Sequence, residues 1–598
     1  MKFRRQIART MVIALSYSQF GFAADLSPGK WKAEDKTRVE TLAQKIWPTR
    51  DRVVEGQLGL ISGTVSPVAV HAGMEALKQG GTAADAAATV ALTQVTTALG
   101  SYSSYAGILQ LLYYEAKTGK VYSLNAGYHS YLNETDPKTI PVSDVGLASL
   151  AGKLPEGPVP EGRKTLVPGF MAGIEAMHQR FGHLRFQELF QPAIWYAENG
   201  VTVSPLLASY FQTREKHLSR TEEGRQFIHQ AGNHLPQAGD RFVQTELAKT
   251  LRSVSKDGAK YMYTGAWGRQ FVSVVQREGG KATLEDMKRY QPVWEEPLST
   301  SFLGNTVFAP GVSGGGGYQV LEALNLLEEL KVDQKGPYWK DPQAFRSLSL
   351  VMQLVFLDSY APQLIHPAGM KFSAKDRATK AYAKTMAPML EALPGDTPSS
   401  DAPHHSDAIV VIDRWGNIAA LGHTIYTAIW GTTGIVVGGI PVPDSGGLLQ
   451  AQLATLKPGE SIPNVEVPIL VLKGAKPVMA TAGIGRSLIP ETVRLLLGTL
   501  GNRVDAPTLM AAPPLLVNSS FTLRPGETYL SKAPVVPEGA YTADFLKNLE
   551  FSGMKVEQVS RRQVLESKGT VVVGMVDPET GTRRSMETTT VLSFAEAY

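Results

Sequence analysis

Apolar and polar residues follow two periods along the chain, and together these predict a mixed α/β protein. From Val68 to Gln79, the apolar residues Val70, Met74 and Leu77 recur at helical spacing, and a glycine pair then ends the helix. The following segment, Ala83–Leu99, is rich in alanine and carries almost no charge. A helix without a polar face is normally buried. We therefore expect this second helix to lie in the core.

Short apolar runs bounded by turn residues predict strands. Gly59–Ser66 has the pattern of a strand and turn, and the apolar arms Ile108–Tyr114 and Lys120–Leu124 predict a hairpin. Further along, a strand at Asn305–Ala309 precedes a glycine-rich turn and a helix from Tyr318 to Leu330. The chain thus mixes hairpins with helices and does not repeat a single unit.

One point of the chain combines an exposed loop with a buried strand. Residues 394–404 form a polar stretch with Pro and Ser, which predicts a loop. It is followed by the most strand-like segment of the sequence, Ala408–Ile412, and by a turn at residues 413–417 that leads into Ile418–Ile425. Long apolar arms around such a turn predict a hairpin in the core.

The first residues have the composition of an export signal. Four basic residues lie within the first nine positions, and an apolar run follows from Met11 to Ala23. Small residues at its end suit a signal peptidase, and the run is shorter than the roughly 20 apolar residues that span a bilayer. We expect residues 1–23 to be a signal peptide and the protein to be secreted or periplasmic; a short membrane anchor or a buried helix is the alternative.

Charge and cysteine content narrow the choice of partners. The 598 residues include 59 Lys+Arg and 55 Asp+Glu, and the four basic residues of the predicted signal account for the net charge of +4. The mature chain is formally neutral, so its charge gives no case for nucleic-acid binding. The chain has no cysteine, which excludes disulfides, a cysteine nucleophile and thiolate metal sites. No later segment is predicted to span a membrane.

Many short blocks occur in the order in which one enzyme family carries them. They are Ser66–Pro67, Ala72–Gly73–Met74, Gly80–Ala87, Val167–Pro168–Gly169, Arg180–Phe181–Gly182, Pro192–Ala193–Ile194, Ala197–Gly200, Val203–Ser204–Pro205, Gly279–Gly280, Thr283–Asp286, Asp413–Asn417 and Lys476–Pro477–Val478. Through these blocks, residues 58–597 resemble the γ-glutamyltranspeptidase (glutathione hydrolase) family, as a divergent member. The resemblance implies an N-terminal-nucleophile hydrolase with a four-layer αββα sandwich, two antiparallel sheets, no cofactor and no metal.

The resemblance also implies a nucleophile. Members of the family are made as one chain and cut themselves through an N→O acyl shift; the freed residue then attacks an amide with its own α-amino group as the base. Counting back from Asp413 places this residue at Ser406, so the bond between His405 and Ser406 is the expected cleavage site. The hydroxyl that hydrogen-bonds the free amine in the family falls on Thr424.

The resemblance also implies how the chain is divided and what it binds. Residues 24–405 and 406–598 would form a large and a small segment that build one αββα domain and stay together as a heterodimer after cleavage. The expected substrate is a small-molecule amide or peptide with a γ-glutamyl or related bond, whose acyl group passes to water or an amine. Backbone N–H groups of Ile484 and Gly485 are expected to stabilise the oxyanion.

The substrate side departs from the family pattern. The Arg that grips the glutamyl α-carboxylate falls on Gly127, a pair of adjacent serines on Asn464–Val465, and a substrate-contacting Asn on Tyr426. Asp444 is the expected counterpart of the acid that binds the amino group. A neutral residue does not replace a bidentate Arg, which argues against glutathione and simple γ-glutamyl amides.

Aromatic residues near these positions suggest a different acyl group. They are Tyr102, Tyr105, Tyr128, Tyr426 and Trp430. If they line one pocket, it is more aromatic and less charged than the family's site and suits an acyl, aryl or lactam-like amide.

Three other hypotheses compete with this one. Gly311–Gly315 fits the G-x-S-x-G pattern of an α/β-hydrolase nucleophile elbow, although four consecutive glycines suit a flexible turn better. His404 and His405 would be metal ligands only if a carboxylate pattern completed the site, and none is near in sequence. Finally, the chain would be an uncleaved binding or scaffold protein if the lost Arg marks a degenerate site. The hydroxyls of Ser406 and Thr424 argue against that.

Overall fold

The computed structural model describes most of the chain after the predicted signal. The described residues are 24–45, 51–143, 159–229, 234–360, 362, 365–366, 372–392, 406–427, 429–485, 487–516, 534–560, 563–564, 568–587 and 593–598. The predicted signal peptide, the predicted loop at residues 394–404 and both histidines of the metal hypothesis lie outside them.

One seven-stranded sheet contains the predicted buried hairpin. Its order is β20-β2-β10-β11-β3-β4-β7, and all neighbours are antiparallel. Its strands are β2 (Leu60–Thr64), β3 (Ile108–Glu115), β4 (Lys120–Ala126), β7 (Val293–Glu295), β10 (Asp407–Ile412), β11 (Ile418–Thr424) and β20 (Ser593–Ala597). Both predicted hairpins, β3–β4 and β10–β11, are confirmed, and they pair with each other through β3 and β11.

The second seven-stranded sheet has the order β1-β19-β18-β15-β14-β9-β8 and is also antiparallel. Its strands are β1 (Arg52–Gly56), β8 (Leu298–Phe302), β9 (Asn305–Ala309), β14 (Val467–Lys473), β15 (Lys476–Ile484), β18 (Thr570–Val576) and β19 (Arg583–Glu587). Each sheet combines strands from before and after residue 406. Neither side of that position can therefore form a sheet core alone.

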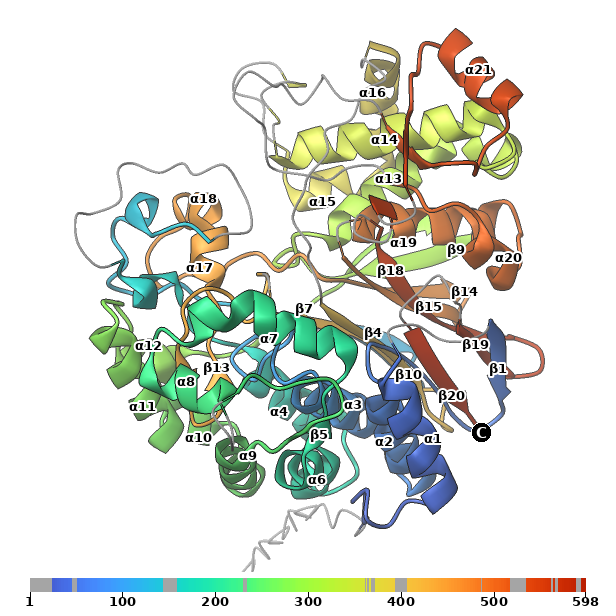
Figure 1. The fold of residues 1–598 in the computed structure, drawn as a ribbon. Coiled ribbons are helices and arrows are strands. Elements are labelled where there is room, and N and C mark those ends of the chain that lie inside the picture. Colours follow the sequence, from blue (N-terminus) through green and yellow to red (C-terminus); the bar gives the residue numbers. More distant parts are fainter. Residues whose placement is uncertain are drawn as a thin grey trace, which may run out of the picture.

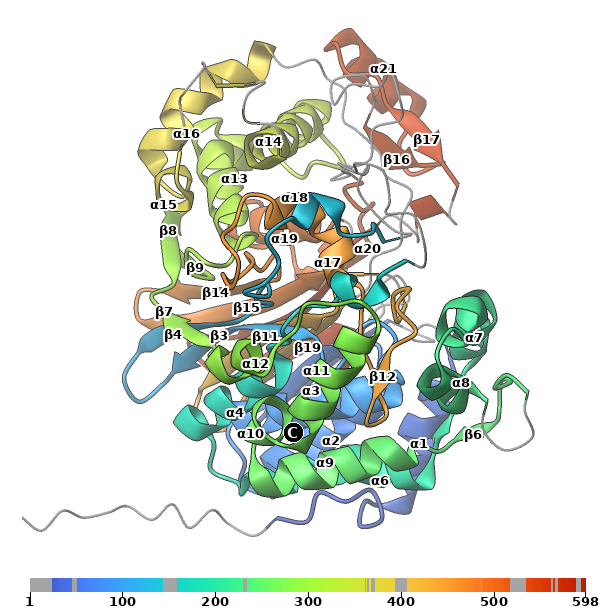
Figure 2. The same ribbon diagram turned by 90° about the vertical axis from the view of Figure 1, so that its left-hand side faces the viewer.

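Side-chain alternation along the strands builds the layers, because neighbouring residues of a strand point to opposite faces. On β10, Ile409 and Val411 pack into the helical layer, whereas Ala408 and Val410 pack against the other sheet. Helices cover both outer faces, as Figures 1 and 2 show. Next to β10 these are α2 (Pro67–Lys78), α3 (Ala83–Thr97) and α4 (Phe170–Phe181); beyond the second sheet they are α13 (Gly317–Glu329), α14 (Pro342–Tyr360) and α19 (Leu488–Leu496). The predicted αββα sandwich is confirmed.

The alanine-rich helix α3 is buried over nearly its whole length, as expected. It begins with a capping box, in which the side chains of Thr82 and Asp85 each bind the other residue's backbone N–H. Further helices lie on both sides of the sandwich. On the side of α3 they include α1 (Ala33–Ala43), α6 (Gln191–Asn199), α7 (Pro205–Leu218), α8 (Glu222–Ile228), α9 (Thr245–Asp257), α11 (Ala266–Arg277) and α12 (Leu284–Arg289). Beyond the second sheet they include α16 (Lys380–Met386), α20 (Ala506–Ala511) and α21 (Ala543–Phe551).

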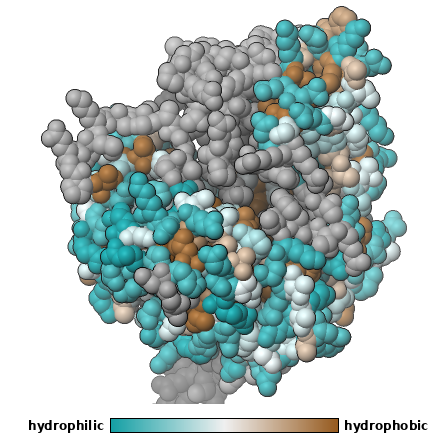
Figure 3. All heavy atoms as spheres, in the orientation of Figure 1, coloured by the Kyte–Doolittle hydropathy of each residue, from teal (hydrophilic) through white to brown (hydrophobic). Residues whose placement is uncertain are grey.

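The surface of the described chain is that of a water-exposed protein on the face that Figure 3 shows, where hydrophobic residues are scattered among hydrophilic ones. Isolated apolar residues on a surface are normal. Within the described ranges, no helix is both long enough and apolar enough to cross a bilayer.

Candidate active site

Ser406 lies immediately before β10, at one end of the space between the two sheets. It precedes Ala408 by two residues, so it shares the face of β10 that looks toward the second sheet. Its side chain is buried, and Oγ donates a hydrogen bond to Oε1 of Glu466 at 3.2 Å. The hydroxyl therefore points to a carboxyl group that comes from the opposite sheet.

Thr424, the last residue of β11, lies across from Ser406. The β10–β11 register pairs Asp407 with His423 and Ala408 with Gly422, and extending it by one residue sets Ser406 opposite Thr424. Cross-strand neighbours have Cβ atoms about 4.5–5.5 Å apart. The Thr424 hydroxyl also accepts the N–H of Tyr426 at 3.1 Å. The two hydroxyl residues singled out in the sequence are thus side by side.

Glu466 completes this group from the second sheet, one residue before β14. It is almost fully buried, and burial raises the pKa of its carboxyl group to about 8; the hydrogen bond from Ser406 opposes this rise and the charge of Asp407 adds to it. Sequence analysis missed Glu466. The available signal was its place as the sole charged residue of the otherwise apolar or neutral segment 462–472.

Gly422 provides the space for the Glu466 carboxyl group. A Cβ atom at position 422 would lie 2.3 Å from Oε2 of Glu466, closer than any real contact. This same Oε2 is buried and has no hydrogen-bond partner among the described residues. The carboxyl group therefore lies directly on the β11 backbone, with one oxygen on Ser406 and one oxygen unused.

The turn after β15 lies at the same end of the inter-sheet space. Val467 pairs with Gly483, and extending this register by one residue sets Glu466 opposite Ile484. Ile484 packs in the inter-sheet cluster with Ala408. Gly485 follows with a φ of +85°, in the left-handed region that favours glycine. Ser406, Glu466 and the turn thus meet from three strands.

A second polar network lies on the opposite face of β10, under the helices. Oδ2 of Asp407 accepts from Oγ of Ser103 at 2.7 Å and Oδ1 accepts from Oγ1 of Thr64 at 3.1 Å, while burial raises the pKa of Asp407 to about 7. His423 Nε2 lies 2.9 Å from Oε1 of Gln94, and burial lowers the His423 pKa to about 3. This histidine is neutral at pH 7.

Tyr426 and Asn464 are joined to each other. The Tyr426 hydroxyl donates to Oδ1 of Asn464 at 2.7 Å and accepts the N–H of Val465. Oδ1 of Asn464 also accepts the N–H of Glu466 at 3.1 Å. The backbone of Tyr426 has a φ of +59°, which is uncommon for a residue with a bulky side chain. The two predicted substrate contacts thus hold the segment that carries Glu466.

The two remaining predicted positions are closely surrounded by the protein itself. A Cβ atom at Gly127 would lie 3.0 Å from the side-chain Oδ1 of Asn125 and 3.2 Å from the carbonyl oxygen of Ile462, so a side chain there would need these neighbours to shift by a few tenths of an ångström. Asp444 is buried and accepts hydrogen bonds from three hydroxyl groups. The donors are Ser143 at 2.7 Å, Thr432 at 2.8 Å and Thr427.

The expectation that five aromatic residues line one pocket is wrong. Tyr128 and Tyr426 are neighbours, with ring centroids 6.2 Å apart. Tyr105 instead packs in the helical core, where its hydroxyl donates to the Leu92 carbonyl at 2.7 Å. Tyr102 and Trp430 belong to another cluster that is built around the helix α7. Which face a tyrosine occupies depends on local backbone direction, which sequence proximity does not give.

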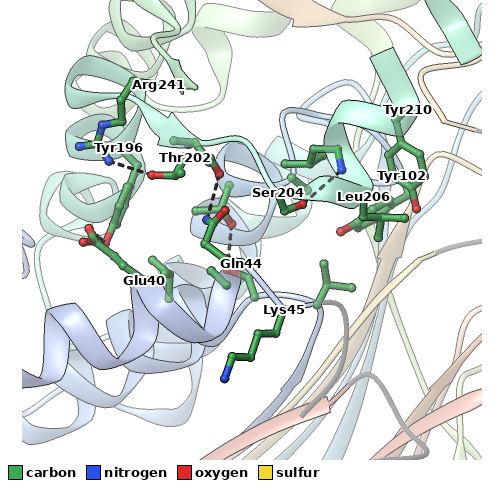
Figure 4. Close-up of a pocket in the computed structure, with 18 residues that line it drawn as sticks. Glu40, Gln44, Lys45, Tyr102, Tyr196, Thr202, Ser204, Leu206, Tyr210 and Arg241 are labelled. Atoms are coloured by element: carbon green, nitrogen blue, oxygen red, sulfur yellow. Dashed lines mark hydrogen bonds between the residues drawn. The ribbon is translucent and has the colours of Figure 1, made fainter. Parts of the chain in front are cut away.

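A cleft opens on the outside of the molecule between α1 and α7 (Figure 4). Gln44 reaches across it toward Thr202, whose carbonyl accepts a hydrogen bond from the Gln44 side chain at 3.3 Å. Tyr102 forms part of the wall, and the next residue, Ser103, binds Asp407. Ser406 is not in the lining. The cleft therefore lies on the helical side of β10, away from the Ser406 hydroxyl.

Among the described residues, the nucleophile-elbow and metal-site hypotheses find none of the partner residues that they would need. Ser313 Oγ donates to Glu295 and accepts from Asn125 Nδ2 at 2.9 Å, where a nucleophile elbow would need a histidine. His404 and His405 are outside the described residues. Among the residues that are described, no group of three or more His, Asp or Glu side chains is placed to hold a metal ion.

The chain is similar to members of one family over most of its length. The family model described as gamma-glutamyltranspeptidase matches residues 69–586. The glutathione hydrolase proenzyme of Escherichia coli is 25% identical over 87% of this chain and 89% of its own length. The acylase ACY 1 proenzyme of a Pseudomonas species is 24% identical over 58% of this chain and 63% of its own.

A solved structure, the cephalosporin acylase from Bacillus halodurans, superimposes with a TM-score of 0.74 at 22% identity, over 93% of this chain and 98% of the other. At that identity, the likeness establishes the fold. The family match covers most of the chain and the sandwich is of the same type. The chain belongs to the γ-glutamyltranspeptidase family of N-terminal-nucleophile hydrolases, as a divergent member that acts on amide bonds.

Proposed function

We propose that the protein is exported, cuts itself before Ser406, and uses the freed Ser406 to transfer an uncharged acyl group from an amide to water or an amine. The observation that carries the proposal is the position of Ser406. It is a buried hydroxyl residue at the start of β10, between the two sheets and across from Thr424.

The mature reaction follows from these positions. Once cleavage frees the α-amino group of Ser406, this amine takes the proton of Oγ, and Oγ attacks the carbonyl carbon of the substrate amide. The Thr424 hydroxyl orients the amine. The N–H groups of Ile484 and Gly485 donate hydrogen bonds to the carbonyl oxygen and stabilise the negative charge that develops on it. The leaving amine takes up the proton, and water or another amine releases the acyl group from Ser406.

The proposed acyl group is uncharged because the positions expected to bind a carboxylate carry no cation. Position 127 is a glycine, and Asn464 is bound by Tyr426. Around Tyr426 lies an apolar cluster that includes Tyr128, Ile108 and Ile462. A free α-carboxylate would lose its hydration there without gaining a charged partner. A relative whose name is acylase is consistent with this substrate class.

The proposed export rests on the basic and apolar composition of residues 1–23. After removal of that segment, residues 24–405 and 406–598 would remain together as a heterodimer. Each sheet takes strands from both, so separation would expose the interior of both sheets.

Intact mass and N-terminal sequencing of the exported protein test the proposal. We expect two chains, the smaller beginning at Ser406, and a single uncleaved chain without amidase activity for Ser406→Ala. Circular dichroism of the variant controls for folding. A wild-type protein that stays a single chain beginning near Ala24 would refute self-cleavage and support the alternative of an uncleaved binding or scaffold protein.

A further inference from the structure

Self-cleavage needs a proton acceptor other than the α-amino group that serves the mature reaction. In the uncleaved chain, the nitrogen of Ser406 belongs to a peptide bond, so its lone pair is delocalised and it is not a base. The hydroxyl proton must therefore pass to another group before Oγ attacks. The acceptor has to lie within about 2.6–3.2 Å of Oγ, or to be linked to it by one water.

Glu466 meets this geometric requirement. Its Oε1 lies 3.2 Å from Oγ of Ser406, and its other oxygen has no partner among the described residues. The group is almost fully buried. Its position is supported from two directions, because Asn464 Oδ1 binds its backbone N–H and Gly422 leaves space for its carboxyl group.

We propose that Glu466 is a further catalytic residue, which takes the hydroxyl proton of Ser406 and so drives cleavage of the precursor. The proposal rests on the proposed role of Ser406 as the nucleophile. Before cleavage, this carboxyl group from the second sheet takes the proton from Oγ of Ser406; after cleavage, the α-amino group of Ser406 does so.

The steps balance without any other reactant than water. Glu466 Oε1 takes the proton as Oγ of Ser406 bonds to the carbonyl carbon of the preceding peptide bond. The C–N bond of the tetrahedral intermediate then breaks, and Glu466 returns the proton to the leaving nitrogen, which leaves an ester and a free amine. A water then adds its hydroxyl to the ester carbon, the bond between that carbon and Oγ of Ser406 breaks, and the remaining hydrogen of the water restores the Ser406 hydroxyl.

The surroundings of Glu466 give cleavage a pH dependence. Ser406 faces Glu466 from β10, and Gly422 and Thr424 share the face of β11 that looks toward it. The charged group that acts on it is Asp407, which together with burial raises the Glu466 pKa; the bond from Ser406 opposes this. Only ionised Glu466 accepts a proton, so cleavage accelerates as pH rises toward about 8.

The test compares variants of the full-length precursor made by cell-free synthesis, with cleavage followed by gel and intact mass between pH 5.5 and 9. We expect Glu466→Gln to slow cleavage about 100-fold or more and to flatten the dependence on pH. Glu466→Asp should keep a pH-dependent rate between these limits. The matched control is Asp407→Asn, another buried carboxyl group beside Ser406 but on the opposite face. Because the Asp407 charge raises the Glu466 pKa, this variant should cleave within about threefold of wild type above pH 8, where Glu466 is ionised in both proteins.

The outcomes separate this proposal from the previous one. A Glu466→Gln precursor that is cut within threefold of the wild-type rate, with the same pH profile, overturns the role of Glu466. If that variant does not fold, Glu466→Asp decides: wild-type rate and midpoint would overturn the role. In contrast, a wild-type precursor that stays intact at every pH, or a Ser406→Ala precursor that is cut, refutes Ser406 itself.

Discussion

The strand pair β10–β11 and the segment around Asn464 and Tyr426 meet at one site, but they differ in how they relate to the family. On β10–β11, hydroxyl groups stand at both positions predicted for the reaction, Ser406 and Thr424, and the two lie across from each other. At the predicted substrate positions, Tyr426 and Asn464 differ from the family pattern and bind each other. The first region keeps the residue types that the family's reaction needs, whereas these two residues of the second do not match its substrate contacts.

This difference teaches that the two hydroxyl groups proposed for the reaction and the residues proposed to contact the acyl group lie on separate segments, with Glu466 next to the second. A strand pair inside a sheet has its register fixed by many backbone hydrogen bonds and a buried face. The substrate side consists of residues that follow strand ends, where side chains can change without disturbing a sheet. Variants of the two regions should therefore act on different steps.

The largest effect is expected for Thr424→Ala. This change removes the hydroxyl across from Ser406 and the acceptor of the Tyr426 N–H. We expect precursor cleavage and amide turnover both to fall by about 100-fold, whereas Thr424→Ser should restore most of each rate. Cleavage is measured by gel and turnover by kcat/KM with an acyl anilide. Full activity of Thr424→Ala would end the assignment of this residue to the reaction.

The sequence was sufficient for the parts of this comparison that depend on local pattern. The alanine-rich, almost uncharged composition of Ala83–Leu99 predicted the buried helix α3, and long apolar arms around a turn predicted the β10–β11 hairpin. The assignment of Ser406, made by counting back from Asp413 within the family pattern, stays a prediction. Glu466 was out of reach because it lies 60 residues from Ser406 in sequence and meets it only when the two sheets pack. Asp407 is likewise distant in sequence from its partner Thr64, 343 residues away, and the two meet through the pairing of β2 with β10. Such contacts are set by strand pairing and sheet packing, which no local spacing encodes.

A smaller and more selective effect is expected for Tyr426→Phe. The variant loses the hydroxyl that joins Asn464 and Val465, which should cost about 1–3 kcal/mol of stability. We expect kcat/KM for an uncharged acyl amide to change about tenfold, because the acyl-binding side loosens. Cleavage should change less than threefold, because Asn464 can still accept the Glu466 N–H in the variant. Equal losses of cleavage and turnover would show that the two regions are not separable.

The smallest expected effect is a change in the pH dependence of stability in Asp407→Asn. An exposed Asp has a pKa near 4, and in the folded protein burial raises the Asp407 pKa to about 7. Between these values the unfolded chain has lost the proton and the folded chain keeps it, so the stabilising contribution is present below about pH 4 and lost as pH rises to 7. Buried neutral His423 acts in the opposite direction between pH 3 and 6.5.

The difference between variant and wild type isolates Asp407 from His423, because both proteins contain the histidine. The melting temperature of Asp407→Asn minus that of wild type should rise by about 1–3 °C from pH 4 to 7 and stay level above pH 8. Differential scanning calorimetry at one scan rate measures it. Asp407 lies on the helical face of β10, so cleavage above pH 8, where Glu466 is ionised with or without the Asp407 charge, should hardly change. A constant difference across this range would mean that Asp407 is ionised in the folded protein, and that its charge already acts on Glu466 at low pH.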